Sequence, residues 1–261
     1  METVILERRG AELRITLNRP DTMNAWNKQL ATDLLAAVRE AGEDDRVRAV
    51  TITGAGRGFS SGADLRAGFD PTPEGHPDVQ AALTERYHPI ITGLRELPKP
   101  VLAAVNGPAV GIGCSLALAA DLIVARESAY FLLAFVNLGL VPDGGSSLLL
   151  PERVGLARAA EMAMLGERIP AAKALEWGLI NRVVPDAELD RAVDELATRL
   201  ANGPTGAYAG IKQQLNAWLF DRMAEQLGLE ASLQQRSAAS GDFREGVRAF
   251  LEKRAAAFGG R

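Results

Sequence analysis

The sequence has little cysteine and little histidine, and it has no long apolar run. Cys114 is its one cysteine, which excludes an intramolecular disulfide framework and fits a reducing compartment. The apolar stretches fall far short of the ~20 residues that span a bilayer. The N-terminal residues METVILERRG read as a first strand with charges inside it, not as a signal peptide. We therefore expect a cytoplasmic protein without a membrane-spanning segment.

Concentrated positive charge is also missing. The formal net charge is −4, and the longest basic runs are the pairs Arg8-Arg9 and Lys253-Arg254. Nucleic acids and anionic membranes are bound by basic patches, so neither is an expected partner. Zinc chemistry is not expected, because the sequence has no H-E-x-x-H motif and no cysteine pair. A serine hydrolase built on Ser115 would need one of the two histidines beside it as a base.

The residues that are present favour a soluble protein with a sizeable core and an α/β fold. Hydrophobic residues make up 47% of the chain and charged residues 24%. Residues 12–18 alternate polar and apolar side chains, which predicts a half-buried strand, and apolar residues four apart predict a helix at 27–41. Segments 47–54, 100–107 and 121–126 read as buried strands, and 112–121 reads as a helix. Strands separated by helices predict a largely parallel sheet.

The second half of the chain is predicted to be mostly helical. The proline-rich stretch 68–78 reads as a surface loop that could cover a site. After residue 155 the pattern predicts helices at 155–165, 170–177, 186–201, 205–219, 221–239 and 242–256. No flexible linker precedes them, so we expect an α/β core over residues 1–200 and a helical C-terminal region over 201–261 that packs on it.

Three glycine-rich turns are the candidate sites of chemistry. The first, GAGRGFSSGADL at 54–65, lacks the G-x-G-x-x-G spacing of a dinucleotide-binding turn. The second, NGPAVGIG at 106–113, opens a predicted helix, and the third holds Asp143. Such turns could aim backbone N–H groups at one point and form an oxyanion hole. They could equally serve only to make tight turns.

The motifs around these turns resemble the enoyl-CoA hydratase/isomerase, or crotonase, family. The segments concerned are LNRPDTMNAW (17–26), FSSGADL (59–65), AAVNGPAVGIGCSLALAADLIVA (103–125), GLVPDGG (139–145), GERIPAAKALEWGLINRVVP (166–185) and EGVRAFLEKRAAAF (245–258). The resemblance runs along nearly the whole chain in the family's order. It implies a core of repeated ββα units, a helical C-terminal trimerisation region, and a homotrimer or a dimer of trimers.

The resemblance also implies the substrate and its contacts. The substrate would be a coenzyme A thioester, and no separate cofactor would be needed because coenzyme A is part of the substrate. The backbone N–H groups of Ala63 and Ile112 would bind the thioester oxygen. The other implied substrate-binding residues are Asn24, Ala25, Asp64, Leu65, Arg66, Ser115, Phe135, Pro142, Phe250 and Lys253.

The sequence departs from the family's hydratases at both of their glutamates. Ser115 and Phe135 stand at those positions, and neither side chain can serve as the required acid or base, so efficient hydration is not expected. Asp143 matches an aspartate of some isomerases and of the aryl-CoA dehalogenases. We therefore expect an isomerase in which Asp143 moves a proton, with apolar neighbours raising its pKa.

Alternative interpretations remain at this point. Asp143 could instead cap the helix that GGSSLLL begins, or do both. As a dehalogenase nucleophile it would need a partner histidine, for which His88 is the better placed of the two. The chain could also keep some hydratase activity, process aryl-CoA substrates, or bind acyl-CoA without catalysis.

Overall fold

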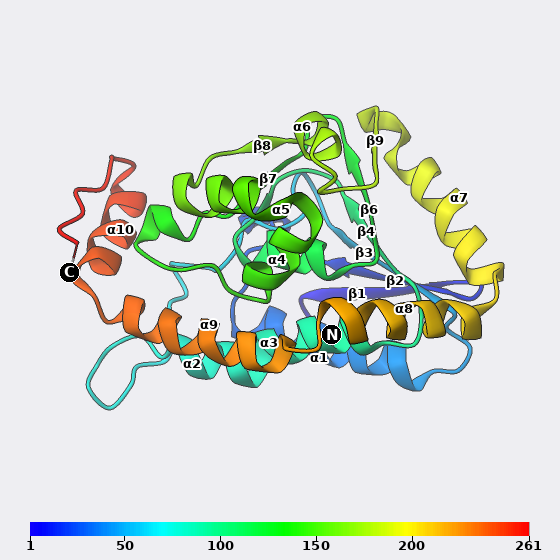
Figure 1. The fold of residues 1–261 in the computed structure, drawn as a ribbon, viewed down its shortest axis with the longest axis horizontal. Coiled ribbons are helices and arrows are strands. Elements are labelled where there is room, and N and C mark those ends of the chain that lie inside the picture. Colours follow the sequence, from blue (N-terminus) through cyan, green and yellow to red (C-terminus); the bar gives the residue numbers. More distant parts are fainter. Residues whose placement is uncertain (261) are drawn as a thin grey trace.

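Residues 1–260 are described by a computed structural model, in which nine strands form two sheets (Figure 1). The strands are β1 (Val4–Arg9), β2 (Glu12–Leu17), β3 (Ala49–Gly54), β4 (Val101–Val105), β5 (Ala109–Val110), β6 (Leu122–Arg126), β7 (Tyr130–Leu132), β8 (Ile169–Pro170) and β9 (Arg182–Val184). The larger sheet has the order β1-β2-β3-β4-β6-β9 and the smaller the order β5-β7-β8. In the larger sheet every pair is parallel except β1–β2.

Helices are interspersed with the strands as far as β9, and all elements after β9 are helices. They are α1 (Lys28–Glu43), α2 (Val79–Ala82), α3 (His88–Glu96), α4 (Ile112–Ala119), α5 (Ser146–Leu165), α6 (Ala171–Glu176), α7 (Leu189–Asn202), α8 (Thr205–Leu219), α9 (Met223–Ala238) and α10 (Gly241–Glu252). Short 3-10 helices occur at Pro20–Thr22, Val136–Leu138 and Asp186–Glu188, and a π-helical turn at Leu83–Tyr87 joins α2 to α3.

The predicted ββα repetition is present in the middle of the chain. The unit β4–β5–α4 is followed by the unit β6–β7–α5. β4 pairs with β6 in the larger sheet and β5 pairs with β7 in the smaller one, both in parallel. The two units therefore stack side by side, and each places a glycine-rich turn at the start of its helix.

One expectation about an individual element needs correction. The strand at 12–18 was expected to have one exposed face, but β2 is buried on both. Its polar residues Glu12 and Arg14 pair with each other, and Arg14 also binds Asp194 of α7, which covers that face. The helix expected at 155–165 and the helix start expected at GGSSLLL are both present, because α5 consists of two helical segments that meet at a non-helical kink at Gly155.

The C-terminal helices pack on the α/β core as expected. α8 contacts α3, and α9 contacts α2 and α5. Figure 1 shows α9 running alongside α2 and α3, with α10 and the C-terminus at one end of the molecule. The boundary expected at residue 200 falls inside α7, which ends at Asn202. Among the helices of residues 1–260, none combines the length and apolar content needed to cross a membrane.

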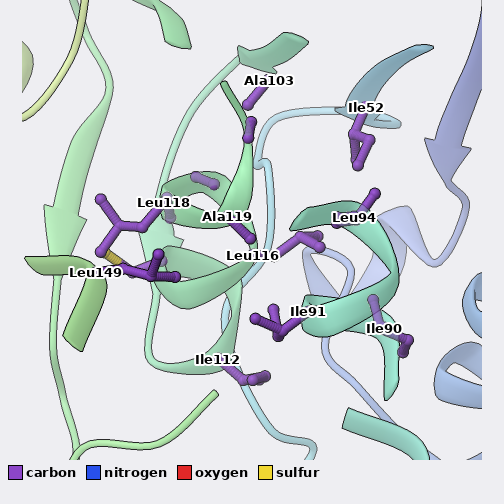
Figure 2. Packing of buried hydrophobic residues seen from close by; sticks show 14 of the residues in the cluster. Ile52, Ile90, Ile91, Leu94, Ala103, Ile112, Leu116, Leu118, Ala119 and Leu149 are labelled. Atoms are coloured by element: carbon purple, nitrogen blue, oxygen red, sulfur yellow. The ribbon is translucent and has the colours of Figure 1, made fainter. Parts of the chain in front are cut away.

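α4 lies in the centre of the core and fixes the second glycine-rich turn. Every residue of α4 is buried, as its apolar sequence requires, because a helix that is apolar all round must be covered on all sides. Figure 2 shows its side chains Leu116 and Leu118 packed between Leu94 of α3 and Leu149 of α5. The N-terminus of α4 is thereby held in one place relative to both neighbouring helices.

Candidate active site

The first two glycine-rich turns touch each other. Gly62 has φ +92° and Gly111 has φ +53°, conformations that favour glycine. A Cβ atom on Gly62 would lie 3.0 Å from the Val110 carbonyl oxygen and 3.9 Å from the Gly111 Cα. Glycine at 62 therefore allows the two backbones to approach, and the next residue of each turn, Ala63 or Ile112, lies beside this contact.

The backbone N–H groups of Ala63 and Ile112 are available to a ligand. Trp26 donates its N–H to the Gly62 carbonyl and accepts from the Asp64 N–H, at 2.7 and 2.9 Å. This parallel bridge turns the Ala63 N–H away from Trp26, and no group within residues 1–260 accepts a hydrogen bond from it. Ile112 is the first residue of α4, where N–H groups have no partner inside the helix. Both N–H groups therefore lack a hydrogen-bond partner among the described residues.

Both residues line one cavity together with Asp143. The cavity has a volume of about 580 Å³. Its further walls are mostly apolar and include Leu65, Phe69, Tyr87, Phe135, Leu140 and Phe250. Such a volume and lining suit a small organic ligand. The three residues assigned to catalysis from the sequence are thus brought together.

The backbone of Asp143 is fixed by two serines. Its carbonyl oxygen accepts hydrogen bonds from Ser115 Oγ at 2.8 Å and from Ser146 Oγ at 2.7 Å. Ser115 belongs to α4, the helix that also supplies the Ile112 N–H. The side chain of Ile112 packs against Gly144, where a Cβ atom would lie 2.4 Å from Ile112 Cδ1. One helix therefore positions both the oxyanion donor and the turn that carries Asp143.

The carboxylate of Asp143 does not cap α5, so the capping interpretation is wrong. Gly145 precedes the helix and has no side-chain cap. Glu230 of α9 takes that role, because its carboxylate accepts from the Gly145 N–H at 2.8 Å and from the Ser147 N–H at 3.1 Å. The Asp143 side chain lies at the cavity instead.

Asp143 is a buried carboxyl with one hydrogen bond. Its Oδ2 accepts from Gln234 Nε2 at 2.7 Å, and its Oδ1 has no partner within residues 1–260. Burial raises its pKa well above the ordinary value, the charge of Glu230 adds to the rise, and the Gln234 hydrogen bond offsets part of it. A carboxyl with a raised pKa is suited to exchange protons near neutral pH.

Tyr87 and His88 lie next to this group in different environments. Tyr87 lines the cavity and packs edge-on against Trp26, with the ring centroids 5.0 Å apart. Burial, together with the charge of Asp143, raises the pKa of its hydroxyl. His88 does not line the cavity, and its Nε2 lies 3.9 Å from Glu230 Oε2. Burial lowers the pKa of His88 to about 4, so it is neutral at pH 7.

The residues expected to bind substrate fall into two groups. Leu65, Phe135 and Phe250 line the cavity. The other expected residues do not line it, and they are Asn24, Ala25, Asp64, Arg66, Ser115, Pro142 and Lys253. Several of these support the turns instead. Asp64, for example, binds Arg19 at 3.0 Å and accepts from the Arg66 and Ala67 N–H groups.

Comparison with known proteins agrees with this geometry. Residues 7–261 match the enoyl-CoA hydratase/isomerase family. The chain belongs to this family. It is 45% identical over 247 residues to a probable enoyl-CoA hydratase of Rhodobacter capsulatus, covering 95% of this chain and 94% of that protein. It is 41% identical over 262 residues to the 1,2-epoxyphenylacetyl-CoA isomerase of Escherichia coli, covering 100% of both.

The fold agrees with that of a solved member of the family. An enoyl-CoA hydratase from Mycobacterium avium subsp. paratuberculosis superimposes with a TM-score of 0.90 at 38% identity, over 98% of both chains. The crotonase-type α/β fold expected from the sequence is thereby confirmed. The names of the family members include both hydratases and isomerases, so membership alone does not select the reaction.

The sequence reasoning missed three residues of the site. Glu230 and Gln234 reach Asp143 and its turn from α9, some ninety positions further along the chain. The available signal was a pair of polar residues four apart on the buried face of a helix. Tyr87 was passed over although it precedes His88, and its π-helical turn is a feature that often marks functional sites.

Asn24 provides a test of how the first turn is held. It is fully buried at φ +58°, its Nδ2 donates to the Ala55 and Gly58 carbonyls, and its Oδ1 accepts from the Arg19 N–H. Asn24→Ala should reduce the free energy of unfolding by at least about 1–3 kcal/mol, because buried backbone groups lose their partners. Denaturant unfolding measures this. Asn24→Gly removes the same bonds without backbone strain, and an unchanged stability in both variants would contradict the assigned role.

Proposed function

We propose that this protein is an enoyl-CoA isomerase that moves a double bond between C3 and C2 of an enoyl-CoA thioester. The observation that carries the proposal is the placement of Asp143 in the same cavity as the free Ala63 and Ile112 N–H groups. Among the described residues that line this cavity, Asp143 is the only carboxylic acid. A reaction that needs one carboxyl suits this site better than one that needs two.

The reaction begins with the thioester oxygen against the two N–H groups. Asp143 Oδ1, which has no hydrogen-bond partner within residues 1–260, accepts a proton from C2 of a 3-enoyl thioester. The electron pair moves onto the thioester oxygen and forms a dienolate. Donors preorganised for such an oxyanion contribute roughly 2.7–4 kcal/mol each in comparable sites.

The same carboxyl completes the reaction. Asp143 returns the proton to C4, the electron pair moves back from the oxygen, and the double bond is now between C2 and C3. No group beyond the substrate's own coenzyme A is needed. The raised pKa of Asp143 makes its carboxylate a stronger base for the first step, and a pKa closer to the working pH makes both protonation states accessible.

A hydratase reaction fits the site less well. Ser115 is at the position of one hydratase glutamate, and its hydroxyl donates a hydrogen bond to the Asp143 backbone carbonyl. Phe135 is at the position of the other, and its phenyl ring lines the cavity. Neither can activate water.

A ring-bearing acyl group is a second candidate substrate, supported by the aromatic walls Phe69, Tyr87 and Phe135 and by the name of the Escherichia coli relative.

The oligomer proposed from the family also has support. Ile211, Leu215 and Trp218 lie on one face of α8 and are exposed, Trp218 by 84%. A stripe of large apolar side chains of this kind is typical of a subunit interface. We therefore propose a homotrimer or a dimer of trimers.

The proposed isomerase activity can be measured directly. Purified protein should convert 3-hexenoyl-CoA into the 2-enoyl isomer, followed by the absorbance of the conjugated product, and should hydrate crotonyl-CoA slowly or not at all. Asp143→Asn should lower the isomerisation rate by about 10²–10⁴-fold, because the variant has no proton acceptor.

Three outcomes would contradict this proposal. They are rapid hydration of crotonyl-CoA, an Asp143→Asn variant as active as the parent, and absence of isomerisation with both 3-hexenoyl-CoA and a ring-bearing enoyl-CoA. Binding of these thioesters without turnover, measured by calorimetry, would indicate a binding protein instead.

The raised pKa of Asp143 predicts that activity and stability depend on pH. The carboxylate is the form that accepts the C2 proton, so kcat should rise with pH through a pKa well above the ordinary 3.8. Folded protein holds this proton more tightly than unfolded protein, so the parent should lose stability as pH rises through that range. Asp143→Asn has no such loss. Its thermal midpoint should exceed that of the parent by a margin that grows with pH, and a margin independent of pH would contradict this.

A further inference from the structure

Gln234 is held against Asp143 in a fixed orientation. It is fully buried, and its Nε2 donates to the Val141 carbonyl oxygen and to Asp143 Oδ2, both at 2.7 Å. A backbone carbonyl can only accept, so the amide nitrogen and not the amide oxygen must face Val141. The hydrogen-bond network therefore determines which way the amide lies.

Stability alone does not explain a glutamine at this position. Its Oε1 is buried and has no hydrogen-bond partner within residues 1–260. Burying an amide oxygen without a partner opposes folding, whereas an apolar side chain of similar size would avoid the penalty. Gln234 also lines the cavity, and the hydrogen bonds that its side chain makes within residues 1–260 are those of its nitrogen.

That nitrogen joins the two residues on either side of Pro142. The proline ring fixes the φ angle of Pro142 and so restricts the backbone that joins Val141 to Asp143. With the Val141 carbonyl and Asp143 Oδ2 bound to one nitrogen atom, the carboxyl cannot rotate freely about its side-chain bonds. Oδ2 is then occupied, and Oδ1 is the oxygen left without a partner.

The helix that carries Gln234 is itself attached to the same turn. Glu230, one turn earlier on α9, accepts from the Gly145 N–H, the Ser147 N–H and Ser147 Oγ. α9 therefore binds the chain both at Val141–Asp143 and at Gly145–Ser147. Gln234 is supported from a rigid element, as precise positioning requires.

We propose that Gln234 is the positioning residue of Asp143, holding Oδ2 so that Oδ1 is directed to the proton on the substrate. The inference rests on the proposed isomerase function and deepens it. It assigns different tasks to the two oxygens of one carboxyl, and it places the control of that carboxyl on α9.

Removal of Gln234 should change the titration of Asp143 in a known direction. The groups that bear on the carboxyl are Glu230 of α9 and Tyr87 of the Leu83–Tyr87 turn, with His88 of α3 beside Glu230. The Gln234 N–H lowers the pKa of Asp143, whereas burial and Glu230 raise it. Without Gln234 the pKa should rise further, and the acidic limb of the activity profile should move to higher pH.

The test compares Gln234→Met with Gln235→Met. Gln235 is the next residue on α9, but it bonds the Gln80 N–H and the Pro77 carbonyl at the start of α2, so it controls for general loosening of the helix. Gln234→Met should lower kcat for 3-hexenoyl-CoA by about 10²-fold, as expected for misplacement of a reacting group. KM should change little, and the acidic limb should shift upward. Gln235→Met should leave the acidic limb in place.

A spectroscopic readout separates this inference from the proposed function. Infrared difference spectra of the parent against Asp143→Asn, without substrate, follow the carboxyl stretch of Asp143 as pH changes. The Asp143 titration should move to higher pH in Gln234→Met and, if that variant does not fold, in Gln234→Leu, which also lacks the amide N–H. An unmoved titration in a folded variant overturns the role of Gln234, even if the isomerase assay succeeds. A moved titration supports it even if 3-hexenoyl-CoA is not a substrate.

Discussion

The site depends on the close contact between the backbones at Gly62 and Gly111. Residues 62 and 111 belong to different strand-to-helix connections, and their contact places the Ala63 and Ile112 N–H groups at one cavity. The contact requires glycine at 62, where the Val110 carbonyl leaves little room for a Cβ atom. It also requires a stationary α4, which the complete burial of that helix provides. The proposed oxyanion hole of main-chain groups would therefore depend on the whole core and not on two loops alone.

The second requirement is a buried carboxyl that has no positively charged partner. Within the described residues the Asp143 carboxyl has no cationic partner and accepts one hydrogen bond, and a second acid, Glu230, lies nearby. This arrangement opposes folding, since a buried charge is poorly solvated. Ser115 and Ser146 hold the Asp143 backbone in place through its carbonyl oxygen. Ser115, which the family resemblance places at the position of a hydratase glutamate, contributes one of these hydrogen bonds.

Sequence patterns were informative where the physics is local. The glycine-rich turns, the apolar helix 112–121 and the isolated Asp143 each have a local signature, and all proved to meet at one cavity. The contribution of α9 has none, because Glu230 and Gln234 look like ordinary polar residues until the fold brings them to the 141–147 turn. The capping interpretation of Asp143 was wrong for the same reason, because Glu230, distant in the sequence, accepts from the N–H groups at the start of α5. Both segments of α5 also have local signals, since GGSSLLL predicts the first and the second follows the kink at Gly155.

The most direct test of the account is whether one carboxyl carries the same hydrogen from C2 to C4. The substrate would be 3-hexenoyl-CoA with deuterium at C2, and the product would be analysed after a single turnover in ordinary water. A single buried Asp143 predicts that a measurable fraction of the product carries deuterium at C4. Product in which C4 has received hydrogen only from water would contradict a shuttle by Asp143 and would require a second proton donor.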